Sequence, residues 1–375
     1  MSFYTRLLRP PLFRLDPEMV HACSIRACRF AGMIPPVRAA FDRCLEVSDE
    51  SLRTTIGGIP IKNPIGLAAG WDKSGDATRM LGHLGFGFAE IGSISANPSK
   101  GNPKPRLFRL PEDRAIVVYY GLQNDGATVI ARRLQMAGKC AVPLGVNIVK
   151  TNNGPDAPDD SDEDTLHDYV RSVRAVAPHA DYLVLNLSCP NAKGGKDFFS
   201  DTANIGRLLA RLAPERVNPP VFLKVVPNAD PAFLEGLIEQ AAPYAFVRGF
   251  LFNLPPGKPA WLRLKTPKSV WEKMPGAVSG APVAESHNAC IRELYPRLPP
   301  GRFEIIGVGG VFSAEDAYEK IRLGASAVQI YTAMIYEGPG VIRRINEGLS
   351  RLLQRDGFRN VREAVGSAHA GVRVG

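Results

Sequence analysis

The sequence predicts an α/β fold, a closed (β/α)8 TIM barrel with an N-terminal two-helix extension. Three observations favour this architecture. Beyond residue 64, short apolar runs alternate with longer helical patterns, which is typical of βαβ units in a parallel sheet. Eight such runs lie within roughly 270 residues, the length of one barrel domain. The chain has 375 residues, of which 45% are hydrophobic and 22% charged, so disordered, collagen-like and small disulfide-stabilised folds are excluded.

The N-terminal residues have the pattern of two short amphipathic helices. Over residues 3–14, aromatic and leucine side chains alternate with arginines. The second helix is expected to begin with Asp16 as its N-cap and Pro17 at its first position, and to end near Gly32. Such a basic, partly apolar pair either docks on the body of the protein or lies in a membrane surface. The pattern alone leaves both possibilities open.

We therefore divide the chain into a helical extension, residues 1–45, and a barrel, residues 46–375. A hairpin is expected over 52–62, because Gly57-Gly58 separates two β-prone runs. The eight barrel strands are expected at 65–69, 88–94, 144–148, 182–186, 221–225, 249–253, 304–307 and 327–330. Two connections, 97–142 and 254–302, are long enough to contribute to function.

Charge and cysteine usage restrict the class of protein. The formal net charge of +9 favours anionic partners, but the basic residues are dispersed and no block resembles a nucleic-acid-binding arm. Six cysteines lie far apart without a CxxC pair, which argues against a disulfide framework and a zinc site. No run approaches the roughly 20 apolar residues of a membrane-spanning helix. Since a signal-peptide pattern is also missing, we expect a reducing cytoplasmic location.

Small and polar residues follow the expected strands at their carboxyl ends, where barrels place their functional residues. These residues are Ala68, Ala69, Gly70, Lys73, Ser93, Asn147, Asn186, Lys224, Asn253, Gly309, Gly310, Tyr331 and Thr332. They include amides and lysines but no His, Asp or Glu cluster that would hold a divalent metal. Buried amides and lysines left unpaired cost about 1–3 kcal/mol each, so we expect a tightly held, flat polar ligand.

The last two strand ends predict a phosphate site. Gly309-Gly310 and Tyr331-Thr332 follow the seventh and eighth strands, where many barrels bind phosphate through backbone amides. A planar cofactor with a phosphate group, FMN, is the simplest interpretation. Lys224 would then stabilise negative charge on the reduced flavin, with a Schiff-base lysine as the alternative.

Cys189, within NLSCPN, is the candidate general base. It follows a strand and is flanked by Asn186 and Asn191, so its thiolate would withdraw a proton from a substrate carbon. The alternative is a packed, unreactive cysteine, which is the usual role of this residue. We interpret the other five cysteines as structural.

These residues occur within motifs that resemble one family. In chain order the motifs are KNPIGLAAGWDKSG, EIGSISANPSKGNPKPRLFRL, NLSCPN, VSGAPV, IIGVGG and AVQIYTAMIYEGP. Together they are similar to the dihydroorotate dehydrogenases, over residues 3–344. The N-terminal run FYTRLLRPPLFRLDPEMVH resembles the helical extension of the membrane-associated, quinone-dependent class 2 enzymes.

The resemblance implies a flavoprotein of pyrimidine biosynthesis that oxidises (S)-dihydroorotate to orotate with a quinone as acceptor. A base, here Cys189, would remove the C5 proton while C6 gives a hydride to the flavin. The implied FMN contacts are Ala68, Ala69, Gly70, Lys73, Ser93, Asn147, Asn186, Lys224, Ser279, Gly280, Gly309, Gly310, Tyr331 and Thr332. The implied substrate contacts are Lys73, Asn186, Asn191 and Asn253, and the implied quinone contacts are His21, Arg109 and Tyr331.

The resemblance also implies peripheral attachment to the cytoplasmic side of a bacterial inner membrane, as a monomer or a homodimer. The helical extension would carry the quinone and membrane contacts. We expect neither a metal nor a nucleic-acid partner. A related tRNA-modifying flavin barrel is disfavoured, because only a short tail follows residue 349 in place of an RNA-binding module.

Four positions depart from the class 2 pattern. Cys189 stands where class 2 enzymes use serine and soluble class 1 enzymes use cysteine. Val118 replaces a substrate-binding asparagine, and Phe252 and Leu254 replace threonines on either side of Asn253. These changes motivate an alternative: a paralogue that oxidises or reduces a different, more apolar ring, or a flavin-binding protein with little turnover.

Overall fold

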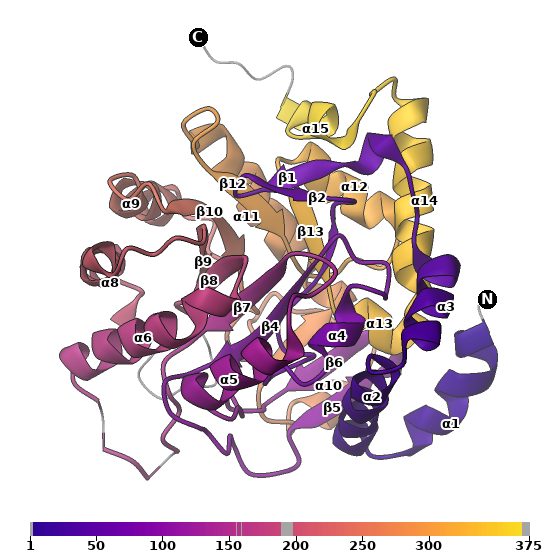
Figure 1. Cartoon of the computed structure of the whole chain (residues 1–375), viewed down its shortest axis with the longest axis horizontal. Helices are drawn as coiled ribbons and strands as arrows, with labels where there is room; N and C mark the ends of the chain where they lie inside the picture. Colours follow the sequence, from indigo (N-terminus) through magenta and orange to yellow (C-terminus); the bar gives the residue numbers. More distant parts are fainter. Residues whose placement is uncertain (1–2, 155, 159, 189–197, 370–375) are drawn as a thin grey trace.

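A closed barrel of eight parallel strands forms the centre of the protein (Figure 1). The computed structural model describes residues 3–154, 156–158, 160–188 and 198–369. Around the barrel the strands are β3 (Ile65–Leu67), β4 (Phe88–Ile94), β7 (Leu144–Ile148), β8 (Tyr182–Asn186), β9 (Val221–Val225), β10 (Val247–Phe252), β12 (Glu304–Gly307) and β13 (Ala327–Ile330). Pairing of β13 with β3 closes the ring. The predicted fold class is confirmed.

Two barrel strands differ in their bounds from the prediction. β3 ends at Leu67, because the chain turns away at Gly70, which has a φ of +107°. β10 begins at Val247, and its pairing with β9 shifts between Val247 and Gly249. Neither change moves the carboxyl ends of the strands away from the common mouth.

Large side chains fill the lower part of the barrel. Phe88, Tyr182 and Phe222 are fully buried there and pack edge to face, with ring centroids 6.0–6.3 Å apart. A Cβ at Gly66 would lie 2.4 Å from the Phe88 ring, so only glycine leaves room for it. This packed layer closes the barrel below and leaves its upper end for a ligand.

Helices cover the outside of the barrel. They are α4 (Thr78–Leu81), α5 (Ala127–Ala137), α6 (Asp162–Val176), α8 (Thr202–Leu212), α9 (Pro231–Ala241), α11 (Ala284–Leu294), α12 (Ala314–Arg322) and α13 (Thr332–Glu337), followed by α14 (Gly340–Arg355) and α15 (Val361–Ala364). The predicted hairpin is present as β1 (Thr54–Ile56) and β2 (Ile59–Ile61), whose isoleucines pack against the packed aromatic layer.

The N-terminal residues form more helix than the sequence predicts. A π-helical turn (Tyr4–Leu8) leads into α1 (Arg9–Arg14), and α2 (Pro17–Ala31) begins with the predicted cap, since Met19 N–H donates to Asp16 Oδ1 at 2.7 Å. A third helix, α3 (Pro35–Leu45), was not predicted. Its leading prolines suggest a break, but proline is also well suited to the first turn of a helix.

This extension docks on the barrel. Tyr4 donates to the Ile335 carbonyl at 2.7 Å, and Arg109 Nη1 donates to the carbonyls of Leu12 and Leu15. Docking still leaves apolar side chains exposed, namely Phe3, Leu7, Leu8, Leu15, Met19, Phe30, Met33 and Ile34. Among the described residues, no helix has the length and apolarity required to span a membrane.

The two long connections contain a small sheet that the sequence analysis missed. β5 (Leu107–Leu110) and β6 (Ala115–Val118) come from the first connection, and β11 (Ala277–Gly280) comes from the second. They form a three-stranded antiparallel sheet in the order β11-β6-β5. The second connection also holds the short helix α10 (Lys268–Trp271). The sheet places Val118 and Ser279 beside the barrel mouth.

Candidate active site

A cavity that is open at its mouth lies at the carboxyl ends of the barrel strands. Most of the predicted site residues line it: Ala68, Ala69, Gly70, Lys73, Ser93, Asn186, Lys224, Asn253, Ser279, Gly309, Gly310, Tyr331 and Thr332. Asn147 lies directly behind this lining, where its Oδ1 accepts a hydrogen bond from Ser93 Oγ. Gly280 also lies behind it, against Thr332. Cys189 and Asn191 fall outside the residues that the structure describes.

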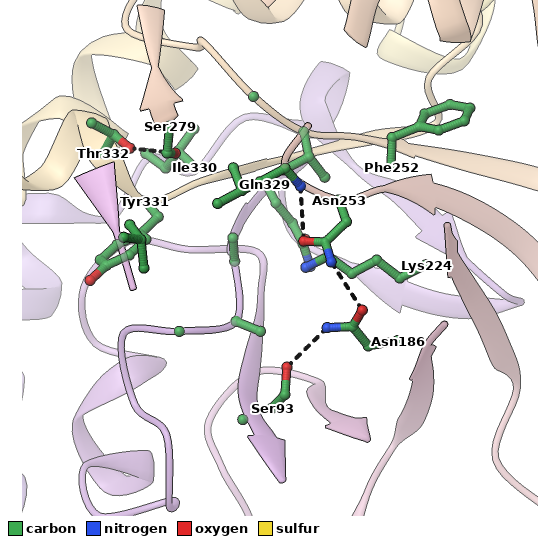
Figure 2. A pocket seen from close by; sticks show the side chains of 18 of the residues that line it. Ser93, Asn186, Lys224, Phe252, Asn253, Ser279, Gln329, Ile330, Tyr331 and Thr332 are labelled. Carbon is green, nitrogen blue, oxygen red and sulfur yellow. Dashed lines mark hydrogen bonds between the residues drawn. The ribbon is translucent and has the colours of Figure 1, made fainter. Parts of the chain in front are cut away.

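The amides of the site form a connected chain (Figure 2). Asn253 Nδ2 donates to Asn186 Oδ1 at 3.0 Å, and Asn186 Nδ2 donates to Ser93 Oγ at 3.1 Å. Asn253 Oδ1 accepts the Leu254 N–H at 2.9 Å, which fixes the orientation of that amide. Asn253 Nδ2 also donates to the Ser188 carbonyl at 3.3 Å, so within the described residues only the Asn186 amide keeps an N–H that can donate to a ligand.

Two residues that the sequence analysis missed extend this chain into the barrel. Glu90 on β4 accepts from Asn147 Nδ2 at 2.7 Å and from Gln329 Nε2 at 2.6 Å. Both Glu90 and Gln329 are almost fully buried. A signal was present in the sequence, since Glu90 is the only charged residue of FAEIGSI and Gln329 is the only polar residue of AVQI.

Lys73 is held between the barrel and α2. Its Nζ lies 2.9 Å from His21 Nε2 and 3.8 Å from the centroid of the Tyr120 ring. Burial, with a further contribution from the nearby Arg106, lowers the pKa of Lys73 to about 7. Burial and the Lys73 charge lower the pKa of His21 well below its ordinary value. A neutral His21 therefore accepts a hydrogen bond from Lys73.

Two consecutive glycines lie at the predicted phosphate end of the site. Gly309 and Gly310 have positive φ values, and a Cβ at Gly310 would lie 2.4 Å from Ala284 Cβ. Side chains are thus excluded and backbone amides are left to face a ligand. Ser279 Oγ and Thr332 Oγ1 lie 3.0 Å apart on the same side and add hydroxyl donors (Figure 2).

The donor set suits a planar nucleotide. Lys224 is 7% exposed and reaches the cavity beside Asn253 (Figure 2). Two buried atoms at the cavity, Gln329 Oε1 and Tyr120 Oη, have no hydrogen-bond partner among the described residues. Unpaired buried polar atoms are unfavourable, so the site suits a ligand that carries complementary polar groups.

The apolar replacements affect the cavity unequally. Val118 on β6 is half-buried and lines the cavity, as does Leu254. Phe252 also belongs to the cavity lining, but its ring points away from Asn253 and Lys224, and the residue is 1% exposed within the main hydrophobic core (Figure 2). The structure therefore places all three replacements at the cavity, with the Phe252 ring turned away from the amides.

The predicted quinone residues lie in separate surroundings. His21 contacts Lys73, and Tyr331 lies in the cavity, where burial raises its pKa. Arg109 lies on β5 under the α1–α2 turn, with its guanidinium 4.7 Å from the Phe13 ring centroid. His21 lines a second cavity together with Lys73 and Tyr120, and neither Arg109 nor Tyr331 belongs to the lining of that cavity.

Comparisons with known proteins agree on one family. The family model described as dihydroorotate dehydrogenase matches residues 51–353. A protein named dihydroorotate dehydrogenase (quinone) from Cereibacter sphaeroides is 39% identical over 373 residues, covering 99% of both chains. The mitochondrial mouse enzyme of that name is 36% identical over 98% of this chain and 91% of its own. The ligand-free enzyme of Eimeria tenella has 31% identity and a TM-score of 0.80, covering 94% of this chain and 99% of that one.

Proposed function

Because the chain belongs to the dihydroorotate dehydrogenase family, we propose that it oxidises dihydroorotate to orotate with a quinone as electron acceptor. One observation carries this proposal: near-full-length relatives named for the quinone reaction include the N-terminal helices as well as the barrel. The barrel mouth supports it, because lysines and amides suit an anionic, amide-rich ring. The paralogue alternative is not favoured, since relatives that match nearly the full chain are named dihydroorotate dehydrogenase (quinone).

The enzyme depends on a flavin, and FMN is the form that the site fits best. Lys224, Asn147 and Ser93 would hold the ring, while the glycine pair Gly309-Gly310 and its neighbouring hydroxyls would hold the phosphate. A bound flavin supplies the hydride acceptor for the substrate and passes the electrons on to the quinone. The single phosphate of FMN would be accommodated by this glycine pair.

Substrate binding and proton removal are assigned to this chain's own residues. Lys73, Asn186, Asn191 and Asn253 would hold dihydroorotate, with the lysine charge on its carboxylate. Cys189 would remove the C5 proton. A free thiol has a pKa of about 8.5 and becomes an effective base where a positive neighbour lowers that value.

The N-terminal residues 1–45 would serve the quinone and the membrane, and residues 46–375 would form the FMN-binding barrel. Exposed Phe3, Leu7 and Leu8 lie close in sequence to Arg6 and Arg9, a combination that favours the surface of an anionic bilayer. We infer peripheral attachment on the cytoplasmic side of a bacterial inner membrane, as a monomer or a homodimer. His21, Arg109 and Tyr331 would lie along the route of the quinone.

Anaerobic mixing of the purified protein with dihydroorotate tests the proposal. The flavin absorbance near 450 nm should bleach, and ubiquinone should restore it. Dihydrouracil, which lacks the carboxylate, is the matched control and should bleach the flavin far more slowly. Faster bleaching by dihydrouracil, or no bleaching by dihydroorotate, would contradict the assignment.

A further inference from the structure

Glu90 is a carboxylate enclosed in the barrel, beneath the residues that line the cavity. It has no exposed surface and is not itself part of the lining. Its Oε1 accepts from Asn147 Nδ2 at 2.7 Å, and its Oε2 accepts from Gln329 Nε2 at 2.6 Å. Both oxygens are thus engaged by amides that continue toward the cavity.

The first amide fixes the direction of the bond at Ser93. A carboxylate accepts hydrogen bonds and cannot donate them, so Asn147 must turn its NH2 group toward Glu90. Asn147 Oδ1 then accepts from the Ser93 hydroxyl. Since the only hydrogen of the Ser93 hydroxyl is used in this bond, Ser93 Oγ offers its neighbours lone pairs alone. One accepts from Asn186 Nδ2 at 3.1 Å, and the other remains on the cavity side.

The second amide fixes an acceptor at Gln329. Its Nε2 is used by Glu90, which leaves Oε1 as its remaining polar atom. Gln329 lines the cavity and is 1% exposed, and its Oε1 has no hydrogen-bond partner among the described residues. A buried acceptor without a partner is unfavourable. A donor on a bound ligand would pair it.

We propose that Glu90 is a positioning residue that makes Ser93 Oγ and Gln329 Oε1 hydrogen-bond acceptors toward the flavin. The isoalloxazine ring offers mainly acceptors along its pyrimidine edge and a single ring N–H, at N3. A cavity with amide and lysine donors complements those acceptors. The acceptors set by Glu90 recognise the one N–H. This inference rests on the flavin role proposed above.

The variant E90Q keeps the shape of the side chain, but it no longer fixes the orientation of both the Asn147 and the Gln329 amides. The introduced glutamine has one accepting oxygen and one NH2 group, so its NH2 must face either Asn147 or Gln329. That partner has to turn over. If Gln329 turns, its acceptor at the cavity becomes a donor; if Asn147 turns, the Ser93 hydrogen loses its acceptor and points to the cavity. Either way one acceptor for the flavin is lost.

The double variant E90Q/N147D exchanges the carboxylate and the amide between positions 90 and 147. It restores the direction of the hydrogen bonds at Ser93 and Gln329. The introduced aspartate accepts from both the NH2 group of the new glutamine and the Ser93 hydroxyl. The oxygen of that glutamine accepts from Gln329 Nε2, so both cavity acceptors and the net charge return. The control E90D keeps the charge but shortens the side chain, so it cannot reach both amides. A role of Glu90 as a buried charge alone predicts that E90D behaves like the wild type.

The readout is the ratio of dissociation constants for FMN methylated at N3 and for FMN itself, measured by fluorescence titration of apoprotein. We expect a ratio on the order of 10 or more in the wild type, because the methylated flavin has no N–H to donate. The ratio should fall severalfold in E90Q and E90D and return in E90Q/N147D. A merely structural role of Glu90 would weaken both flavins equally.

An unchanged ratio in E90Q, or a double variant that binds FMN without recovering the ratio, would overturn the proposal. If E90Q does not fold, Q329L provides the test instead. It removes the acceptor Gln329 Oε1 while leaving Glu90 in place, so it must lower the ratio of the two dissociation constants. Turnover is not used as a readout. A protein that shows these ratios but does not oxidise dihydroorotate therefore contradicts the proposed function alone.

Discussion

Lys73 and His21 meet where the N-terminal extension joins the barrel, with 2.9 Å between Nζ and Nε2. Lys73 belongs to the predicted substrate and flavin site, and His21 to the predicted quinone site. The half-buried His21 ring is neutral and accepts the hydrogen bond, so it does not share the positive charge. Glu18, also on α2, raises the pKa of Lys73 against the effect of burial, so the ionisation of Lys73 depends on the position of α2.

Binding of orotate should weaken as the pH rises through about 7. The pKa of Lys73 is lowered to about 7, so its amine is charged below that pH and neutral above it. An anionic ligand needs the charged form, and its dissociation constant should approach a tenfold rise per pH unit above the pKa. Spectral titration with orotate between about pH 6 and about pH 9, on a C189S background that removes the thiol, measures this effect.

K73R is the matched control for this experiment. Its guanidinium stays charged throughout the range, so the dissociation constant should become nearly independent of pH. A flat profile in the C189S parent would show that Lys73 is charged across the range and would contradict the lowered pKa.

Replacing Cys189 separates the base from the cofactor site. C189A should bind flavin normally but reduce it with dihydroorotate about 100-fold or more slowly, the usual scale for loss of a general base. C189S should keep some activity, because a hydroxyl can still accept the proton. Stopped-flow measurement of flavin bleaching under anaerobic conditions gives these rates. Equal rates in the wild type and C189A would remove Cys189 from the mechanism.

Val118→Asn should improve the reaction with dihydroorotate. Val118 lines the cavity where the family pattern has an amide, so an asparagine can restore one hydrogen bond to a polar substrate. One such bond is worth about 1–1.5 kcal/mol, which predicts roughly a tenfold increase in kcat/KM. V118A is the control, since it enlarges the cavity without adding a donor. Improvement in V118A and not in V118N would mean that space, rather than the missing amide, limits the substrate.

The barrel could be predicted because its strands are buried on both faces. The runs of β7 and β9 are apolar except for one residue each, Asn147 and Lys224, and helical patterns separate them; their predicted bounds are confirmed. The strands β5, β6 and β11 could not be recognised in the same way. Each has four residues, and their partners are set by contacts between two distant connections.

The site residues were predicted from the rule that barrels place functional residues at the carboxyl ends of their strands. That rule selects residues at the end of a strand or next to it, such as Lys224 and Asn253, and the structure brings these together at one mouth. Glu90 lies in the middle of β4 and is outside the rule, whereas Gln329 lies one position before the end of β13, as Lys224 does in β9, and was within its reach. The contact of Tyr120 with Lys73 depends on the docked α2 and could not be inferred from spacing.

Arg109→Met should damage quinone reduction while sparing the barrel reaction. Arg109 Nη1 donates to the carbonyls of Leu12 and Leu15 at 3.2 and 3.0 Å, and its guanidinium covers the Phe13 ring. These contacts fix the turn between α1 and α2, and methionine replaces only the stem. Because the turn lies at the surface, water can solvate the freed carbonyls and the fold should persist.

We therefore expect the KM for ubiquinone to rise about tenfold in R109M, while the rate with a soluble dye acceptor stays unchanged. R43M, which removes an exposed arginine from α3 of the same extension, controls for the loss of one positive charge near the membrane. A parallel loss with dye and quinone would mean that Arg109 supports the flavin reaction itself. An unchanged KM for ubiquinone would mean that neither Arg109 nor the α1–α2 turn that it fixes contributes to quinone binding.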